Sequence, residues 1–122
     1  MTILILEDEL GRRDAFAHKL GEHAITYTDN ALLAVKMLHL QQYDAVFLDH
    51  DLGDVLDGRF VARCYHGSQN LRTPTLVHSI NPSGSEEMVR ILKDQKVPVT
   101  KCPFCSTVFW SVVKRFLDGL ET

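Results

Sequence analysis

The sequence predicts one α/β domain in which a five-stranded parallel sheet is doubly wound, with helices on both faces. Apolar, strand-like runs alternate with segments of helical spacing from one end of the chain to the other. Five such strand–helix units fill 122 residues, and their alternation favours parallel strands joined by helical crossovers. This length suffices for one hydrophobic core but not for two, so we treat residues 1–122 as a single domain.

Each expected strand is a short apolar run, and each expected helix has apolar residues at intervals of three or four. The expected strands are 2–7, 23–28, 44–49, 74–79 and 97–101. The expected helices are 10–20, 30–41, 57–66, 84–94 and 105–120. In chain order, the run that opens the chain predicts the first strand, and Ala31, Val35 and Leu38 predict one face of the second helix.

The later elements are justified in the same way. The third strand contains four consecutive apolar residues, Ala45 to Leu48, which indicates burial on both faces. The third helix is short and begins near Gly58, so it is the weakest of the five. Phe109, Val113 and Phe116 have the spacing of one face of the last helix.

The composition argues against several classes of protein. The chain is 45% hydrophobic and 24% charged, with a net charge of -3 and a sequence pI of about 6.0. No basic patch is present to contact a nucleic-acid backbone, so we expect no extended nucleic-acid surface. The apolar run at the N-terminus lacks a basic flank and is too short for a signal peptide or membrane span. We therefore expect a cytoplasmic protein that does not contact a membrane.

Ionisable and polar side chains follow four of the predicted strands. Because the carboxyl ends of parallel strands share one edge of the sheet, where ligands bind in open α/β folds, we expect these side chains to converge. They are Glu7, Asp8 and Glu9 after the first strand, Asp49, His50 and Asp51 after the third, His78, Ser79 and Asn81 after the fourth, and Lys101 after the fifth. Carboxylates from two strands can hold Mg²⁺, and a hydroxyl and an ammonium group can bind phosphate oxygens.

The arrangement resembles the receiver domain of two-component response regulators, over nearly the whole chain. Residues 3–9 look like the first strand and acidic pair of that family, and Asp49 falls where its phosphorylated aspartate lies. Ser79, 30 residues later, matches the hydroxyl position, and Lys101, after another 22 residues, matches the lysine. The resemblance implies the flavodoxin-like receiver fold.

Two segments resemble a narrower variant, the cyclic-phosphate-processing receiver domain. These are 48–53, which contains His50, and 77–88, which contains His78 and Asn81. Ordinary receivers have no need of these three side chains. The resemblance implies a metal-dependent phosphoesterase that opens cyclic phosphates on ribose or nucleotide ends.

The resemblance and the chemistry together assign roles to the residues at this edge. We expect Asp8, Asp49 and Asp51 to bind a divalent ion, with Mg²⁺ favoured and Mn²⁺ as the alternative. We expect His50 and His78 to transfer protons, because the unperturbed pKa of imidazole lies near working pH. Asp49 counts among the catalytic residues as well, as ligand, nucleophile or both.

Four further residues are expected to bind substrate, which would be a small phosphate ester or nucleotide. They are Ser79, Asn81, Gly84 and Lys101. Asn81 would orient the substrate or fix a histidine tautomer, and Gly84 would donate its backbone N–H at the start of a helix.

Simpler structural roles exist for several of these residues. His50 alone could be a hydrogen-bonded loop histidine. Asp51 and Asp54 could cap the third helix, and Ser83 or Ser85 could be the N-cap of the fourth.

Two other functions stay open. Asp49 could accept a phosphoryl group from a histidine kinase, detected by Ser79 and Lys101, or the fold could be a binding module without activity. The segment from Cys102 to Cys105 resembles glutaredoxin-type sites that open a helix, but packing thiols are the simpler reading.

Overall fold

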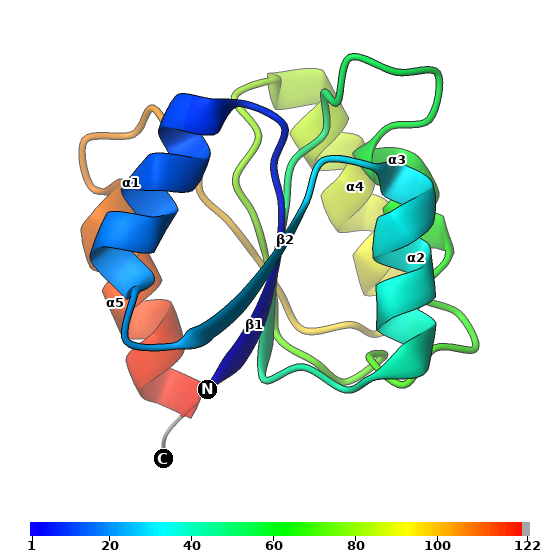
Figure 1. Ribbon diagram of the computed structural model, residues 1–122. Helices are drawn as coiled ribbons and strands as arrows, with labels where there is room; N and C mark the ends of the chain where they lie inside the picture. The colour runs from blue at the N-terminus through cyan, green and yellow to red at the C-terminus, as the bar shows by residue number, and fades with distance from the viewer. Residues whose placement is uncertain (121–122) are drawn as a thin grey trace.

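The computed structural model describes residues 1–120 and has the predicted fold, a five-stranded parallel sheet covered by helices on both faces (Figure 1). The strand order is β2-β1-β3-β4-β5. The strands are β1 (Thr2–Leu6), β2 (Ala24–Thr28), β3 (Ala45–Leu48), β4 (Thr75–Val77) and β5 (Val99–Lys101). The helices are α1 (Leu10–Leu20), α2 (Ala31–Leu40), α3 (Gly58–Arg63), α4 (Pro82–Asp94) and α5 (Phe109–Leu120).

Two hydrophobic cores lie on opposite faces of the sheet. Helices α1 and α5 cover one face, and α2, α3 and α4 cover the other (Figure 1). Successive strand residues alternate between the cores: Ile5 and Phe47 pack under α1 and α5, whereas Leu6 and Leu48 pack under the other three helices. All four are fully buried, as the continuous apolar runs of β1 and β3 predict.

The predicted elements are confirmed, but several boundaries and caps differ. Helix α4 begins at Pro82, two residues earlier than expected, and its N-cap is Asn81, whose side chain accepts from the N–H of Gly84. The prediction of Ser83 or Ser85 as the cap is therefore wrong; proline at the first helical position is favoured because its φ is already helical. Likewise, α3 is capped by Asp57 rather than by Asp51 or Asp54.

Helix α5 begins at Phe109, four residues later than expected. The segment between β5 and α5 forms turns, so neither Cys102 nor Cys105 lies at a helix N-terminus. Cys102 is buried and Cys105 is exposed, and both are free thiols. The helix dipole that lowers thiol pKa in redox motifs is thus missing here, which favours packing roles for these cysteines.

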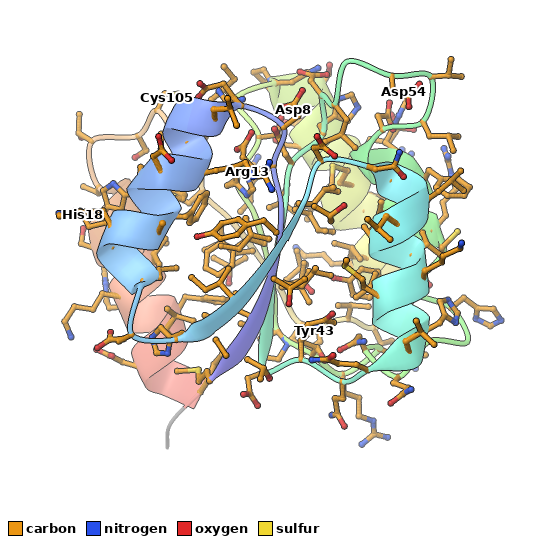
Figure 2. All side chains as sticks on the ribbon, in the orientation of Figure 1. Asp8, Arg13, His18, Tyr43, Asp54 and Cys105 are labelled. Carbon is orange, nitrogen blue, oxygen red and sulfur yellow. The ribbon has the colours of Figure 1, made fainter. Side chains whose placement is uncertain are left out.

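All the loops that follow the strands meet at one end of the molecule. Figure 2 shows Asp8, Asp54 and Cys105 at this end, and Tyr43 at the other. None of the helices in residues 1–120 combines the length and apolar character needed to cross a bilayer.

Gly58 packs the start of α3 directly against the end of β3. A Cβ at this position would clash with the backbone oxygen of Asp49 and lie 2.7 Å from Cε of Met88. Because backbone cannot yield as a flexible side chain can, we expect Gly58→Ala to lower the free energy of unfolding by about 3 kcal/mol. Urea denaturation measures this. Gly119→Ala in α5 is the matched control, since its added Cβ meets no atom within 4 Å, and equal stability of the two variants would contradict the packing argument.

Candidate functional site

The strand register places the polar residues at the carboxyl edge in two groups. Phe47 of β3 pairs with Ile5 of β1 and with Leu76 of β4. Two residues further along each strand, on the same face, come Glu7, Asp49 and His78. The alternate positions place Asp8, His50 and Ser79 toward the opposite face. We call Glu7, Asp49 and His78 the inner cluster.

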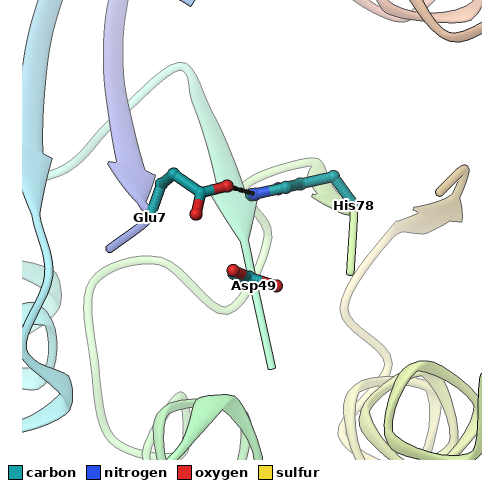
Figure 3. Close-up of side chains that lie close together, drawn as sticks. All are labelled: Glu7, Asp49 and His78. Carbon is teal, nitrogen blue, oxygen red and sulfur yellow. Dashed lines mark hydrogen bonds and ion pairs between the residues drawn. The ribbon is translucent and has the colours of Figure 1, made fainter. Parts of the chain in front are cut away.

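The inner cluster is a compact, buried group of two carboxylates and an imidazole (Figure 3). One ligand atom from each residue lies within 4.8 Å of the other two. The Nε2 atom of His78 is 2.9 Å from Oε1 of Glu7. Glu7 and His78 are at most 1% exposed, and Asp49 is 4% exposed. Such burial of two carboxyl groups requires compensation by cations or protons.

Glu7 is stabilised as a carboxylate. Burial alone would raise its pKa, but hydrogen bonds from His78 and from Nε of Arg12, at 3.0 Å, outweigh burial and lower the pKa to about 2. Burial lowers the pKa of His78, although Glu7 opposes this shift. We therefore assign a neutral ring whose Nε2–H donates to Glu7, leaving Nδ1 as an acceptor. That Nδ1 atom is buried and has no hydrogen-bond partner within residues 1–120.

Asp49 is the member of the inner cluster whose charge is least compensated. Burial, followed by the charge of Glu7, raises its pKa to about 7. Its Oδ1 accepts from the backbone N–H of His50 at 2.8 Å, but its buried Oδ2 has no hydrogen-bond partner in the part of the chain described. A buried carboxylate oxygen without a donor, beside a second carboxylate, is what a divalent cation would satisfy. The inner cluster thus fits a metal ion.

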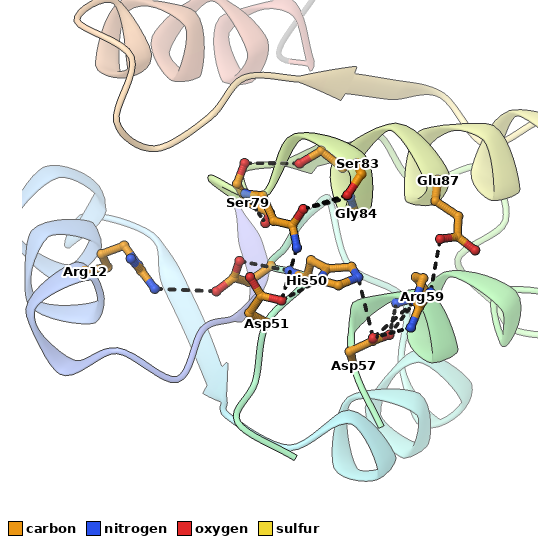
Figure 4. A network of polar contacts seen from close by, with 12 residues as sticks. Arg12, His50, Asp51, Asp57, Arg59, Ser79, Ser83, Gly84 and Glu87 are labelled. Carbon is orange, nitrogen blue, oxygen red and sulfur yellow. Dashed lines mark hydrogen bonds and ion pairs between the residues drawn. The ribbon is translucent and has the colours of Figure 1, made fainter. Parts of the chain in front are cut away.

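His50 lies in the second group and is fixed on both ring nitrogens (Figure 4). Its Nδ1 is 2.7 Å from Oδ1 of Asp51, and its Nε2 is 3.5 Å from Oδ2 of Asp57. Asp57 is held in turn by Arg59, whose Nη1 is 3.1 Å from Oε2 of Glu87 on α4. The imidazole is thus clamped between carboxylates that are themselves held in place.

Gly84 gives the His50 ring the space it occupies. A Cβ at Gly84 would lie 2.5 Å from Cδ2 of His50. The helix therefore approaches the imidazole more closely than any other residue would allow. The backbone N–H of Gly84, which was expected to bind phosphate, donates to Asn81 at 3.0 Å as part of the helix cap.

The structure distributes the predicted metal ligands over both groups. Asp49 belongs to the inner cluster. Asp8 lies at the rim, close to Gly53, and burial together with the charge of Glu7 raises its pKa. Asp51 is turned toward His50, and its side chain is 62% exposed. Among residues 1–120, the inner cluster is the group of three side chains close enough to share one ion, which adds Glu7 to the expected ligands. Asp8 and Asp51 stay predicted ligands.

The predicted phosphate-binding residues also have internal partners. The Oγ of Ser79 accepts from the backbone N–H of Asn81 at 3.1 Å, and Ser79 is 2% exposed. The Nδ2 of Asn81 is 3.4 Å from Oδ1 of Asp51, the oxygen that also binds His50, in keeping with a role in fixing that histidine. Lys101 is exposed at the end of β5 and makes no ion pair within residues 1–120.

Glu7, Arg12 and Asp57 were not among the site residues assigned specific roles from the sequence, although signals existed for Glu7 and Asp57. Period-two alternation from the apolar Ile5 would have placed Glu7, not Asp8, beside Asp49. The spacing of Asp57 before Gly58 is that of a helix cap. Arg12 lies in a helix, and nothing in the sequence showed that its side chain turns back to Glu7.

An open pocket adjoins the site. It has a volume of about 620 Å³ and is lined by the loop between β3 and α3, including Asp51, Gly53 and Val55. Another pocket, of about 690 Å³, lies between α1 and α5 and contains none of the predicted site residues. The pocket of about 620 Å³ is lined by Asp51 and Asp57, the two carboxylates that hold His50, and by no member of the inner cluster.

The solved structures to which this chain is similar include receiver domains. The receiver domain of the sensor histidine kinase PA1611 from Pseudomonas aeruginosa, with a magnesium ion coordinated in its active-site cleft, matches with a TM-score of 0.77 and 19% identity, over 99% of this chain and 98% of that one. The receiver domain of the Francisella response regulator 1452 matches with a TM-score of 0.72 and 19% identity, over 98% and 96%. These likenesses confirm the fold.

A third structure is somewhat more similar in sequence. The signal receiver domain of a signal transduction histidine kinase from Syntrophus aciditrophicus is 27% identical, with a TM-score of 0.68, over 97% of this chain and 90% of that one. No curated protein sequence matches the chain. The model of the cyclic-phosphate processing receiver domain matches residues 2–94, which is more than half of the chain. The chain therefore belongs to the family of cyclic-phosphate-processing receiver domains.

Proposed function

We propose that the protein is a metal-dependent phosphoesterase that opens a cyclic phosphate on a nucleotide or ribose. The proposal is carried by the inner cluster, in which Oδ2 of Asp49 lacks a hydrogen-bond donor beside the carboxylate of Glu7. The residue that follows Asp49 is His50, whose imidazole is clamped by Asp51 and Asp57. A phosphorylation switch needs the carboxylates but has no use for that imidazole. The family to which the chain belongs supports the same chemistry.

Opening the ring is a hydrolysis. The oxygen of water bonds to phosphorus as one O–H bond of that water breaks and the proton passes to solvent. The bond to one ribose oxygen breaks, that oxygen takes up a proton, and a phosphate monoester results. The ion held by Glu7 and Asp49 would lower the pKa of a bound water and compensate the charge of the phosphate. The protein must then supply the proton for the leaving oxygen.

The two histidines have different surroundings, and we assign them different tasks. His50 is 8% exposed and follows β3 at the carboxyl edge of the sheet, so we assign it the transfer of a proton to the leaving oxygen. His78 is 1% exposed and donates to Glu7. It therefore positions the Glu7 carboxylate, and its effect on the reaction passes through that residue.

A panel of 2′,3′-cyclic nucleotides, incubated with Mg²⁺ and separately with Mn²⁺, tests this function. We expect conversion to a phosphate monoester, detected by ³¹P NMR, and no conversion when EDTA is present. Absence of conversion for every cyclic phosphate with both ions would contradict the proposal.

A second candidate function is favoured by the position of Asp49 and by the structural match to receiver domains. Asp49 follows β3 at the site that receivers phosphorylate, so the chain could accept a phosphoryl group there. Incubation with acetyl phosphate and Mg²⁺ should then add one phosphoryl mass, and Asp49→Asn should prevent it. A protein that shows neither conversion nor this added mass would be a binding module.

A further inference from the structure

Arg12 reaches from α1 into the inner cluster. It lies in the first turn of the helix, where its backbone N–H donates to the N-cap carboxylate of Glu9 at 3.0 Å. Its Nε is 3.0 Å from Oε1 of Glu7, and its Nη2 is 3.7 Å from Oδ2 of Asp49. Figure 4 shows the guanidinium pointing from α1 into the polar network. Arg12 is thus the cation beside both carboxylates.

The two Nη groups of the guanidinium keep donors that make no hydrogen bond to another side chain within residues 1–120. Only Nε makes a hydrogen bond to another side chain within residues 1–120, because the separation of Nη2 from Asp49 is too long for one. The side chain of Arg12 is 24% exposed, whereas those of Glu7 and Asp49 are 0% and 5% exposed. Its Cζ is 6.0 Å from the ring centroid of Phe104, which limits its movement on that side. Arg12 therefore connects the buried carboxylates with solvent.

The charge around Arg12 decides when it can bind an anion. Carboxylate oxygens of Glu7, Glu9 and Asp49 lie within 3.8 Å of its nitrogens, so without another cation the surroundings repel phosphate. A divalent ion on Glu7 and Asp49 would compensate this charge. The planar fork of the guanidinium then matches two phosphate oxygens, as an ammonium group does not.

We propose that Arg12 binds the phosphate of the substrate through its two Nη groups, once a divalent ion occupies the inner cluster. The proposal rests on the metal centre of the proposed function and adds a substrate-binding residue to it. Lys101, the cation expected from the sequence, contributes a more distant charge from the exposed end of β5.

Binding of inorganic phosphate, measured by isothermal titration calorimetry with and without saturating Mg²⁺, tests the role of Arg12. We expect Arg12→Gln to weaken the Mg²⁺-dependent affinity by about 10- to 100-fold, because it removes charge-assisted hydrogen bonds. Arg12→Lys keeps the charge but loses the fork, so we expect an intermediate loss. The matched control is Arg13→Gln, since Arg13 lies over the ring of Tyr27 instead. Circular dichroism of each variant verifies that it is folded.

Two outcomes overturn the assignment: Arg12→Gln binds phosphate as tightly as the unchanged protein, or the unchanged protein binds no phosphate in Mg²⁺. The assignment and the proposed function fail separately. Phosphate binding that depends on Arg12 without conversion of any cyclic nucleotide supports the assignment and contradicts the phosphoesterase. If the unchanged protein converts a cyclic nucleotide but Arg12→Gln binds phosphate as tightly as the unchanged protein, the phosphoesterase is supported and the role of Arg12 is contradicted.

Discussion

His50→Ala should lower the turnover of the best cyclic nucleotide by about 10²–10⁴-fold, the contribution typical of a positioned general acid. The ring is held by Asp51 and Asp57 and packs on Gly84, so it has one position relative to the inner cluster. Alanine removes the proton donor and leaves the backbone N–H that binds Asp49. We therefore expect kcat to fall while KM changes little. Initial rates measured by ³¹P NMR provide both constants.

The control for this prediction is His18→Ala, an exposed imidazole on α1. It should leave turnover unchanged. A second variant, Gly84→Ala, keeps the imidazole but displaces it, and should reproduce much of the loss. If His50→Ala retains full activity, the proton donor lies elsewhere.

Asp49→Asn should stabilise the metal-free protein at neutral and alkaline pH. The pKa of Asp49 is raised from 3.8 to about 7, chiefly by burial and then by Glu7. A raised carboxyl pKa contributes stability below pH 4, which is lost as pH rises to 7 because the folded state must then give up a proton it holds tightly. Asparagine cannot ionise. Since one pKa unit corresponds to about 1.4 kcal/mol, we expect the variant to be more stable at pH 8 by about 4 kcal/mol.

Urea denaturation at pH 4.5 and pH 8, with EDTA present, measures this difference. The free energies of unfolding of the unchanged protein and of Asp49→Asn should be similar at pH 4.5 and should differ at pH 8. Asp54→Asn, which changes an exposed carboxyl group, should match the stability of the unchanged protein at both pH values. Saturating Mn²⁺ should restore stability to the unchanged protein but not to Asp49→Asn, because an ion that binds only the folded state stabilises it. Parallel pH dependence of the two proteins would contradict the burial of a charged Asp49.

The sequence was sufficient for the fold because its signals are local and repeated. The four apolar residues of β3 required burial on both faces, and alternation with helical segments required parallel crossovers. Helix ends were less well predicted: Asn81 and Pro82 start α4, whereas the serines that follow look equally suitable as caps. Which polar residue caps a helix depends on backbone geometry that composition alone does not specify.

The location of the site was predicted more accurately than the contacts within it. Convergence of Asp49 and His78 follows from parallel strands sharing an edge, and the structure brings both together. The prediction of Asp8 as a ligand did not use side-chain alternation, which places Glu7 on the face of Ile5 and Asp49 on the face of Phe47. The position of Arg12 could not be predicted, because it depends on how α1 crosses the sheet and on the rotamer that reaches Glu7.

In the proposed site, strand ends that are far apart in the sequence meet around one divalent ion. Isothermal titration calorimetry of Mn²⁺ into the metal-free protein measures whether this ion binds there. We expect one ion per chain, with affinity at least about tenfold weaker in Glu7→Gln and in Asp49→Asn and unchanged in Asp14→Asn on the exposed face of α1. This arrangement is wrong if the unchanged protein binds no Mn²⁺, or if all three variants bind Mn²⁺ with the affinity of the unchanged protein.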